Sequence, residues 1–64
     1  MTQNDAILRA LKRGKVITAG FALREFGVFR LAARIHELRQ RGVDIHRTIV
    51  EKNNRRFAAY WIPT

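Results

Sequence analysis

The sequence contains no cysteine and no serine. Disulfides and thiolate metal sites are therefore excluded, and so is a Ser–His or Cys–His catalytic pair. No apolar run reaches the roughly 18 residues of a membrane-spanning helix. The first ten residues, MTQNDAILRA, are polar and lack the apolar core of a secretory signal. We therefore expect a cytoplasmic protein that does not associate with membranes.

Acidic residues are scarce. Five Asp and Glu stand against 13 Lys and Arg, which gives a net charge of +8 and a pI of about 11.6. Ten of the 13 basic residues are Arg, whose planar guanidinium suits paired contacts with phosphate or guanine. This balance predicts an acidic partner, and nucleic acid is the commonest one. The alternative is a basic but otherwise ordinary protein.

No arrangement of residues suggests catalysis or a cofactor. His36 and His46 lack a third metal ligand at suitable spacing, and we expect His36 to flank the core or to contact backbone. The five carboxylates are scattered, and there is no glycine-rich phosphate loop. We therefore predict a protein that is not an enzyme and that needs neither a metal nor a cofactor.

The 64 residues suffice for one small domain, 1–64, which would bury only ~60% of the surface of its unfolded chain. Thr2, followed three residues later by Asp5, predicts a capped first helix. Thr18 is a natural cap for a short second helix over 19–26, and Gly27 suits a tight turn after it. We expect three side chains of this helix to face the core: Ala22, Leu23 and Phe26.

The central stretch, 28–41, predicts a third helix with two contrasting sides. Leu31, Ile35 and Leu38 recur at helical spacing, with Val28 and Ala32 beside them, and form a stripe that would face the core. Three arginines and one glutamate also recur at steps of three or four residues. We expect them to lie on the side of the helix opposite the stripe. These residues are Arg30, Arg34, Glu37 and Arg41.

After Gly42 the pattern changes to that of a β-hairpin over about 43–62. Its turn would fall at Asn53 and Asn54, since Asn tolerates the positive φ that hairpin turns need. The returning strand carries three aromatic residues, which we expect to close the core beneath the hairpin. Stacking on single-stranded nucleic acid is the alternative for them. The three are Phe57, Tyr60 and Trp61.

This order of elements is that of a winged helix-turn-helix domain. The segment TAGFALREFGVFRLAARIHELRQRGVDI also resembles the small winged helix-turn-helix proteins of phages and prophages. The likeness covers nearly the whole chain. It implies an α+β fold of three helices and a C-terminal two-stranded wing, which binds double-stranded DNA with the third helix in the major groove. It also implies a location at the nucleoid or in the host-cell cytoplasm.

The third helix supplies the first group of candidate DNA contacts. Arg30 and Arg34 lie near its start, where this motif reaches base edges, and Arg can pair with guanine. Ala33 between them would keep the face flat. Glu37 either accepts a hydrogen bond from cytosine or pairs with Arg34 along the helix, which we favour. Arg41 is expected to contact the DNA backbone or to be a plain surface charge.

The predicted turn of the hairpin supplies the second group. Its cations and amides would bind phosphates, and one Arg would suit the minor groove. The alternative is an ordinary charged hairpin tip. Thr18 can leave backbone N–H groups of the second helix facing a phosphate. The hairpin residues concerned are Lys52, Asn53, Asn54, Arg55 and Arg56.

Several alternatives stay open. The domain could act as a small transcriptional regulator or as a recombination accessory factor. A winged-helix scaffold could instead bind an acidic protein partner, because fold alone does not settle function. RNA binding and membrane binding are weaker candidates. A homodimer or a helper protein would extend the small footprint of one domain on DNA.

Overall fold

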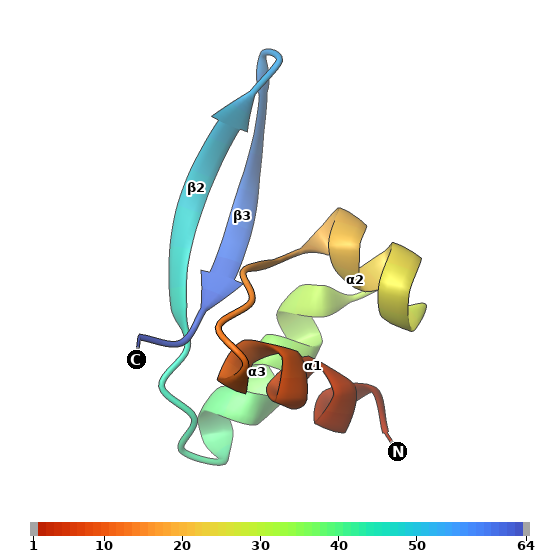
Figure 1. Cartoon of the computed structure of the whole chain (residues 1–64), viewed down its shortest axis with the longest axis vertical. Coiled ribbons are helices and arrows are strands. Elements are labelled where there is room, and N and C mark those ends of the chain that lie inside the picture. Colours follow the sequence, from red (N-terminus) through yellow and green to blue (C-terminus); the bar gives the residue numbers. More distant parts are fainter. Residues whose placement is uncertain (1, 64) are drawn as a thin grey trace.

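The computed structural model describes residues 2–63 of the chain. It confirms the α+β arrangement of three helices and a C-terminal hairpin (Figure 1). The short strand between the first two helices is present as well. The elements in chain order are α1 (Gln3–Lys12), β1 (Ile17–Thr18), α2 (Ala19–Phe26), α3 (Leu31–Gln40), β2 (His46–Lys52) and β3 (Arg55–Trp61).

The first two helices begin where their capping residues predict. The Thr2 hydroxyl accepts a hydrogen bond from the Asp5 backbone N–H at 3.1 Å, and the Thr2 N–H donates to the Asp5 carboxylate at 3.3 Å. The Thr18 hydroxyl accepts from the Phe21 N–H at 3.2 Å and so caps α2. Gly27 follows α2 with a φ of 66°, the left-handed conformation expected for the turn.

The third helix is shorter than the predicted 28–41. It begins at Leu31, and Arg30 is its N-cap, with φ −121° and ψ 70° and no capping hydrogen bond from its side chain. Arg41 is the C-cap. Val28 is only 2% exposed, but it enters the core from the turn before the helix. Its spacing from Leu31 therefore imitates helical periodicity, and this is why the predicted start was wrong.

The sheet has the strand order β1-β3-β2, and both pairings are antiparallel. The two-residue turn of the hairpin lies at Asn53 and Asn54, with φ values of 53° and 62°, as the sequence predicts. The hairpin begins later than the predicted residue 43. Ile45 is 5% exposed and belongs to the core, and its carbonyl accepts two hydrogen bonds from the Arg39 guanidinium at 2.9 and 3.1 Å. The segment before β2 is therefore a connector that packs on the helices.

The core lies where the three helices meet β1 and the lower part of β3. Two predictions about it were wrong. Leu23 is 45% exposed rather than buried. Of the three hairpin aromatics only Tyr60 joins the core, whereas Trp61 stacks on His46 with 4.9 Å between ring centroids. The buried hydrophobic residues are Ile7, Leu11, Ile17, Ala22, Val28, Leu31, Ile35, Leu38, Ile45, Ala59 and Tyr60.

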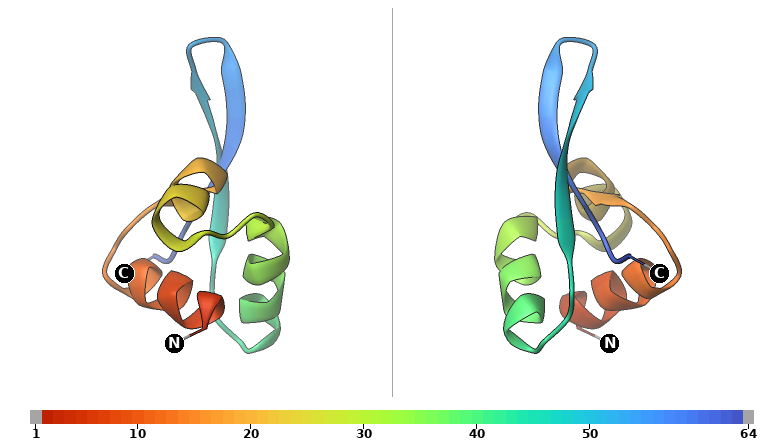
Figure 2. Two further views of the ribbon diagram at one scale, coloured as in Figure 1. Left: turned by 90° about the vertical axis from the view of Figure 1, so that its right-hand side faces the viewer. Right: turned by 90° about the vertical axis from the view of Figure 1, so that its left-hand side faces the viewer.

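The aromatic residues separate because successive side chains of a strand point to opposite faces. Ala58 and Tyr60 face the helices, so Trp61 lies on the alternate face. Phe57, nearer the turn, is half-buried and borders the start of α2. The upper part of the hairpin, with its turn, rises beyond the three helices in both views of Figure 2. That part of the chain is free to contact another molecule.

Candidate nucleic-acid interface

The outward face of α3 is set by its buried stripe. Leu31, Ile35 and Leu38 fix the rotation of the helix against the core. The side opposite this stripe carries mostly small or uncharged residues. Ala33 there is half-buried. The exposed residues of α3 are Ala32, His36, Arg39 and Gln40.

Arg34 and Glu37 do not lie on the face opposite the stripe, as we expected, but on the flank of α3 beside α1. The Arg34 Nε lies 3.3 Å from a carboxylate oxygen of Glu37, which is the intrahelical pair that we favoured. The same oxygen accepts a hydrogen bond from the Asn4 side chain of α1 at 3.1 Å. Both side chains are half-buried. Helical spacing from the buried stripe places both residues on this flank. The contact with α1, which sequence periodicity does not reveal, holds them there.

The turn before α3 brings Arg30 back toward Arg34. Both line a shallow hollow together with Gln3 and Phe29. Phe29 is 86% exposed, the highest value among the exposed large hydrophobic residues. Arg41 is exposed at the other end of the helix, after its last turn. Arg30 and Arg34 therefore lie close together at the start of α3, whereas Arg41 lies at the opposite end of the helix.

The N-terminus of α2 lies beside the hairpin. Ala19 and Gly20, in the first turn of α2, border a hollow whose other side is formed by Arg55, Arg56 and Phe57 of β3. Thr18, the capping residue, lines the same hollow. Backbone N–H groups at a helix start favour an anion, and the two arginines add positive charge. The structure thus places the predicted Thr18 contact next to two of the predicted wing cations.

A second hollow connects the start of α2 with the start of α3. It runs from Phe29 and the first turn of α3 to Phe57, Ala58 and Tyr60 of β3, and it also includes Ala19. Because the two hollows share Ala19 and Phe57, the surface is continuous from the start of α3 to the hairpin. We call this continuous surface the helix–wing surface.

The tip of the hairpin is exposed and basic. The five residues predicted there, from Lys52 to Arg56, are all exposed. Arg56 lies 3.9 Å from Glu51, an exposed ion pair that contributes little. Lys52 and Arg55 face each other across the strands, and like charges at facing positions destabilise a hairpin. A bound anion would relieve this repulsion.

Sequence reasoning missed several residues on this side of the molecule. His36 is exposed, not against the core as expected. Arg47 pairs in register with Tyr60 and so points to the same face of the sheet, beside the helices. Counting helical steps from the buried stripe alone would have found the missed helix positions. They are His36 and Gln40. Ala32, which was expected beside the buried stripe, is exposed instead, and Phe29 in the turn carried no such signal.

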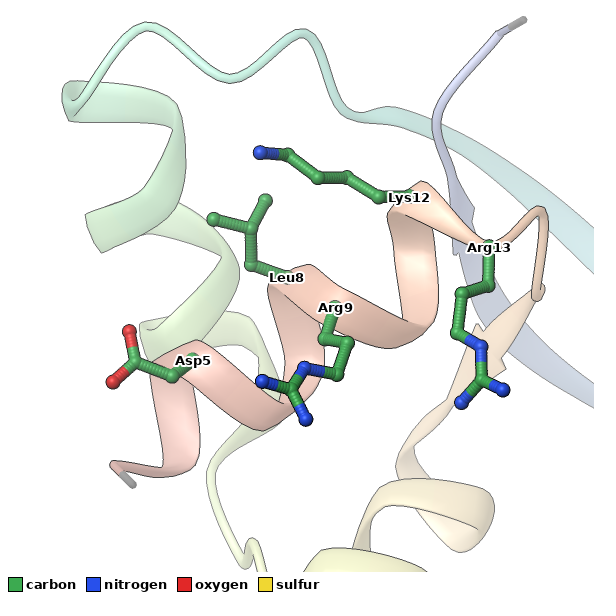
Figure 3. A pocket seen from close by; sticks show the side chains of 5 residues that line it. All are labelled: Asp5, Leu8, Arg9, Lys12 and Arg13. Carbon is green, nitrogen blue, oxygen red and sulfur yellow. The ribbon is translucent and has the colours of Figure 1, made fainter.

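A separate basic surface lies on α1. Figure 3 shows its hollow, where Lys12 extends above Leu8 while Arg9 and Arg13 point to the other side of the helix. The buried residues of α1 are Asn4, Ile7 and Leu11, so these cations face away from the core. Asp5 lies at one end of this surface. Its pKa is lowered mainly by the hydrogen bond from the Thr2 backbone, and to a smaller extent by the hydrogen bond with the Thr2 side chain.

Two further observations limit the chemistry of the site. Within residues 2–63, no three His, Cys, Asp or Glu side chains come together as metal ligands would. No helix in this part of the chain is long and apolar enough to cross a membrane. The helix–wing surface combines the guanidinium groups of Arg30, Arg55 and Arg56 with apolar side chains, and this combination suits binding of an anionic polymer.

Comparison with known proteins places these features in a family. Residues 2–64 match the family described as "Winged helix-turn-helix domain". No curated protein and no solved structure is significantly similar to the chain. The match covers the helices and the hairpin together, so it includes the whole helix–wing surface.

Proposed function

The chain belongs to the winged helix-turn-helix family, and from this premise we propose that it binds double-stranded DNA sequence-specifically. Membership itself indicates DNA binding and is typical of proteins that are not enzymes. In our proposal α3 enters the major groove, and the β2–β3 hairpin contacts the backbone or the minor groove as a wing. The observation that carries it is the continuous helix–wing surface, which joins the start of α3, the start of α2 and two arginines of the hairpin, Arg55 and Arg56.

Each part of this surface has a distinct role. Arg30 is exposed directly before α3 and would contact a base edge. Arg34 lies beside it, partly neutralised by Glu37, and would reach the groove from the flank. Ala33 allows close approach to the bases. These contacts would read the sequence, because base-edge contacts specify and phosphate contacts position.

The remaining predicted residues would bind the backbone. Lys52, Arg55 and Arg56 would neutralise phosphates, and Asn53 and Asn54 would donate hydrogen bonds to them. The first turn of α2, capped by Thr18, would present N–H groups to another phosphate. Arg41 would contact the backbone at the far end of α3.

We further propose that this domain, 1–64, acts in the cytoplasm as a small phage-type transcriptional regulator or recombination accessory factor. One copy offers a limited footprint, which restricts affinity and specificity. A homodimer or a helper protein would provide the additional contacts. Selection of bound duplexes from a random pool would report the target sequence and the symmetry and spacing of half-sites.

The test compares two variants on the duplex that such a selection enriches. Arg30→Ala should relax base preference at one position, with a loss of about 1–3 kcal/mol in discrimination. Lys52→Ala should weaken all sequences alike and reduce the slope of log K against log salt by about 0.9. Lys12→Ala removes the same charge from the outer face of α1 and is the matched control. It should change the slope much less.

Two results would contradict the proposal. One is a selection that enriches no duplex, together with affinity that stays in the non-specific range for every sequence. The other is an equal change of the salt slope for Lys12→Ala and Lys52→Ala. The second result would indicate a diffuse effect of net charge rather than contact by the wing.

A second candidate function is binding of an acidic protein partner. The observation that favours it is the basic surface of α1, where Arg9, Lys12 and Arg13 face away from the core. A partner that this surface recruits would be retained from nuclease-treated lysate. It should be lost when Arg9 and Arg13 are both replaced by Glu, and kept with Lys52→Ala. Loss with Lys52→Ala alone would contradict this function.

A further inference from the structure

Phe29 is exposed although its backbone is firmly held. The residue before it, Val28, is 2% exposed, and the Val28 N–H donates to the Ala22 carbonyl at 3.2 Å. The Gln3 side chain of α1 donates to the Gly27 carbonyl at 3.3 Å. Phe29 itself is 86% exposed. The turn is therefore fixed by its neighbours, and the ring of Phe29 contributes almost no burial to the fold.

The first turn of α3 offers little hydrogen bonding to a base. Leu31 is buried, Ala32 is exposed and Ala33 is half-buried. Neither alanine has a side-chain donor or acceptor. With Phe29 in front of them, they form an apolar surface where a recognition helix reaches base edges. The only group on a base edge of the major groove that suits such a surface is the 5-methyl group of thymine.

The charges around this apolar surface agree with a DNA strand rather than an apolar peptide. Phe29, Ala32 and Ala33 line the same hollow as Arg30 and Ala19. The adjoining hollow, which shares Ala19, is lined by Arg55 and Arg56. An apolar centre between arginines and a helix start is complementary to a base methyl flanked by phosphates.

We propose that Phe29, together with Ala32, recognises the 5-methyl group of thymine in the major groove. This inference rests on the proposed function and adds a specificity-determining residue to it. It assigns base preference to the apolar start of α3, in addition to the arginines. The preferred sites should contain thymine at the position that faces the start of the helix.

The experiment uses the duplex enriched by selection, synthesised with thymine or with uracil at each single position. Uracil lacks only the methyl group and keeps the same hydrogen-bonding edge. One buried methyl group corresponds to about a fourfold change in Kd. The wild-type protein should therefore lose about threefold to fivefold affinity for uracil at one or two positions. Phe29→Ala should bind the thymine duplex more weakly and no longer distinguish the two bases.

Two controls separate this effect from general damage. Val16→Ala shortens another exposed apolar residue, outside the helix–wing surface, and should keep the distinction between thymine and uracil. Phe29→Leu should keep part of it. Circular dichroism melts of all variants should agree with that of the wild type, because neither Phe29 nor Val16 is buried.

The possible failures are distinct. If the selection enriches a duplex but wild type binds thymine and uracil equally, the inference is wrong while the proposed function stands. Retained discrimination by Phe29→Ala would also overturn it. If Phe29 instead covers a second copy of the chain, Phe29→Ala would lower the apparent mass in sedimentation and leave the discrimination intact. A selection that enriches no duplex would overturn both proposals.

Discussion

The three helices and the hairpin of this chain are stabilised in different ways. The buried stripe of α3 contacts side chains from the other two helices, and its three members are at most 4% exposed. Along β2, by contrast, every residue is exposed except Val50, which is half-buried. The outer part of the hairpin, between Ile49 and Ala58, is held by its own strand pairing and its Asn53–Asn54 turn.

This difference determines where function can reside. In the helical part, most substitutions change packing, so its residues are constrained by the fold. In the outer hairpin, charge can accumulate without loss of packing, and facing cations such as Lys52 and Arg55 are tolerated. The exposed side of α3 and the side chain of Phe29 combine a backbone fixed by the fold with side chains that are free to vary. They are rigidly placed by the core but contribute no burial to it, as a recognition surface requires.

Truncating an apolar side chain in each region should show the largest contrast. Leu38→Ala removes a fully buried side chain and should cost about 2–5 kcal/mol, enough to unfold much of a domain this small. Ile49→Ala removes a side chain that is 53% exposed on β2, and should cost less than about 1 kcal/mol. Urea denaturation followed by circular dichroism measures both. Comparable losses would mean that the hairpin carries packing that its exposure does not indicate.

Two glycines of the helical part should respond in opposite directions to the same substitution. Gly27→Ala forces a side chain into a left-handed conformation at φ 66°, although nothing lies within 4 Å of the new Cβ. It should cost about 1–2 kcal/mol through the backbone alone. Gly20→Ala, inside α2 and also in open space, should stabilise by about 0.5–1 kcal/mol. Thermal melts with the same sign for both would contradict this account of the turn.

The smallest expected effect is at the exposed capping box of α1. Folding lowers the pKa of Asp5 below its ordinary value of 3.8, chiefly through the Thr2 backbone hydrogen bond. The contribution of the carboxylate to stability is thus present above pH 3.8 and is lost as the pH falls through the folded pKa. NMR titration should place the Asp5 midpoint below 3.8. Asp5→Asn should remove the loss of stability that protonation of Asp5 causes at low pH. A titration midpoint of Asp5 at its ordinary value would show that the capping box does not form in solution.

Local signals in the sequence predicted the elements that local interactions determine. The caps at Thr2 and Thr18 and the left-handed Gly27 act within a few residues, and all three are confirmed. The turn at Asn53 and Asn54 is confirmed for the same reason. These features need no knowledge of tertiary contacts.

The details that depended on contacts between distant elements could not be predicted in this way. Val28 continues the spacing of the α3 stripe but packs from a turn. The hydrogen bond between Asn4 and Glu37, which lie 33 residues apart in sequence, has no local signal either. Trp61 was expected to close the core with the other hairpin aromatics, but its strand position directs it to His46. The roles of the candidate DNA contacts remain predictions, since sequence pattern and geometry supply positions but not binding.

The central claim is that the start of α3 and the tip of the hairpin contact one DNA duplex together. Titration of the isotopically labelled protein with the selected duplex, followed by backbone amide shifts, tests it most directly. Shifts are expected over 29–33, at His36 and Gln40, and over 52–56, with little change over 9–13. Shifts confined to 9–13, on the outer face of α1, would contradict the account.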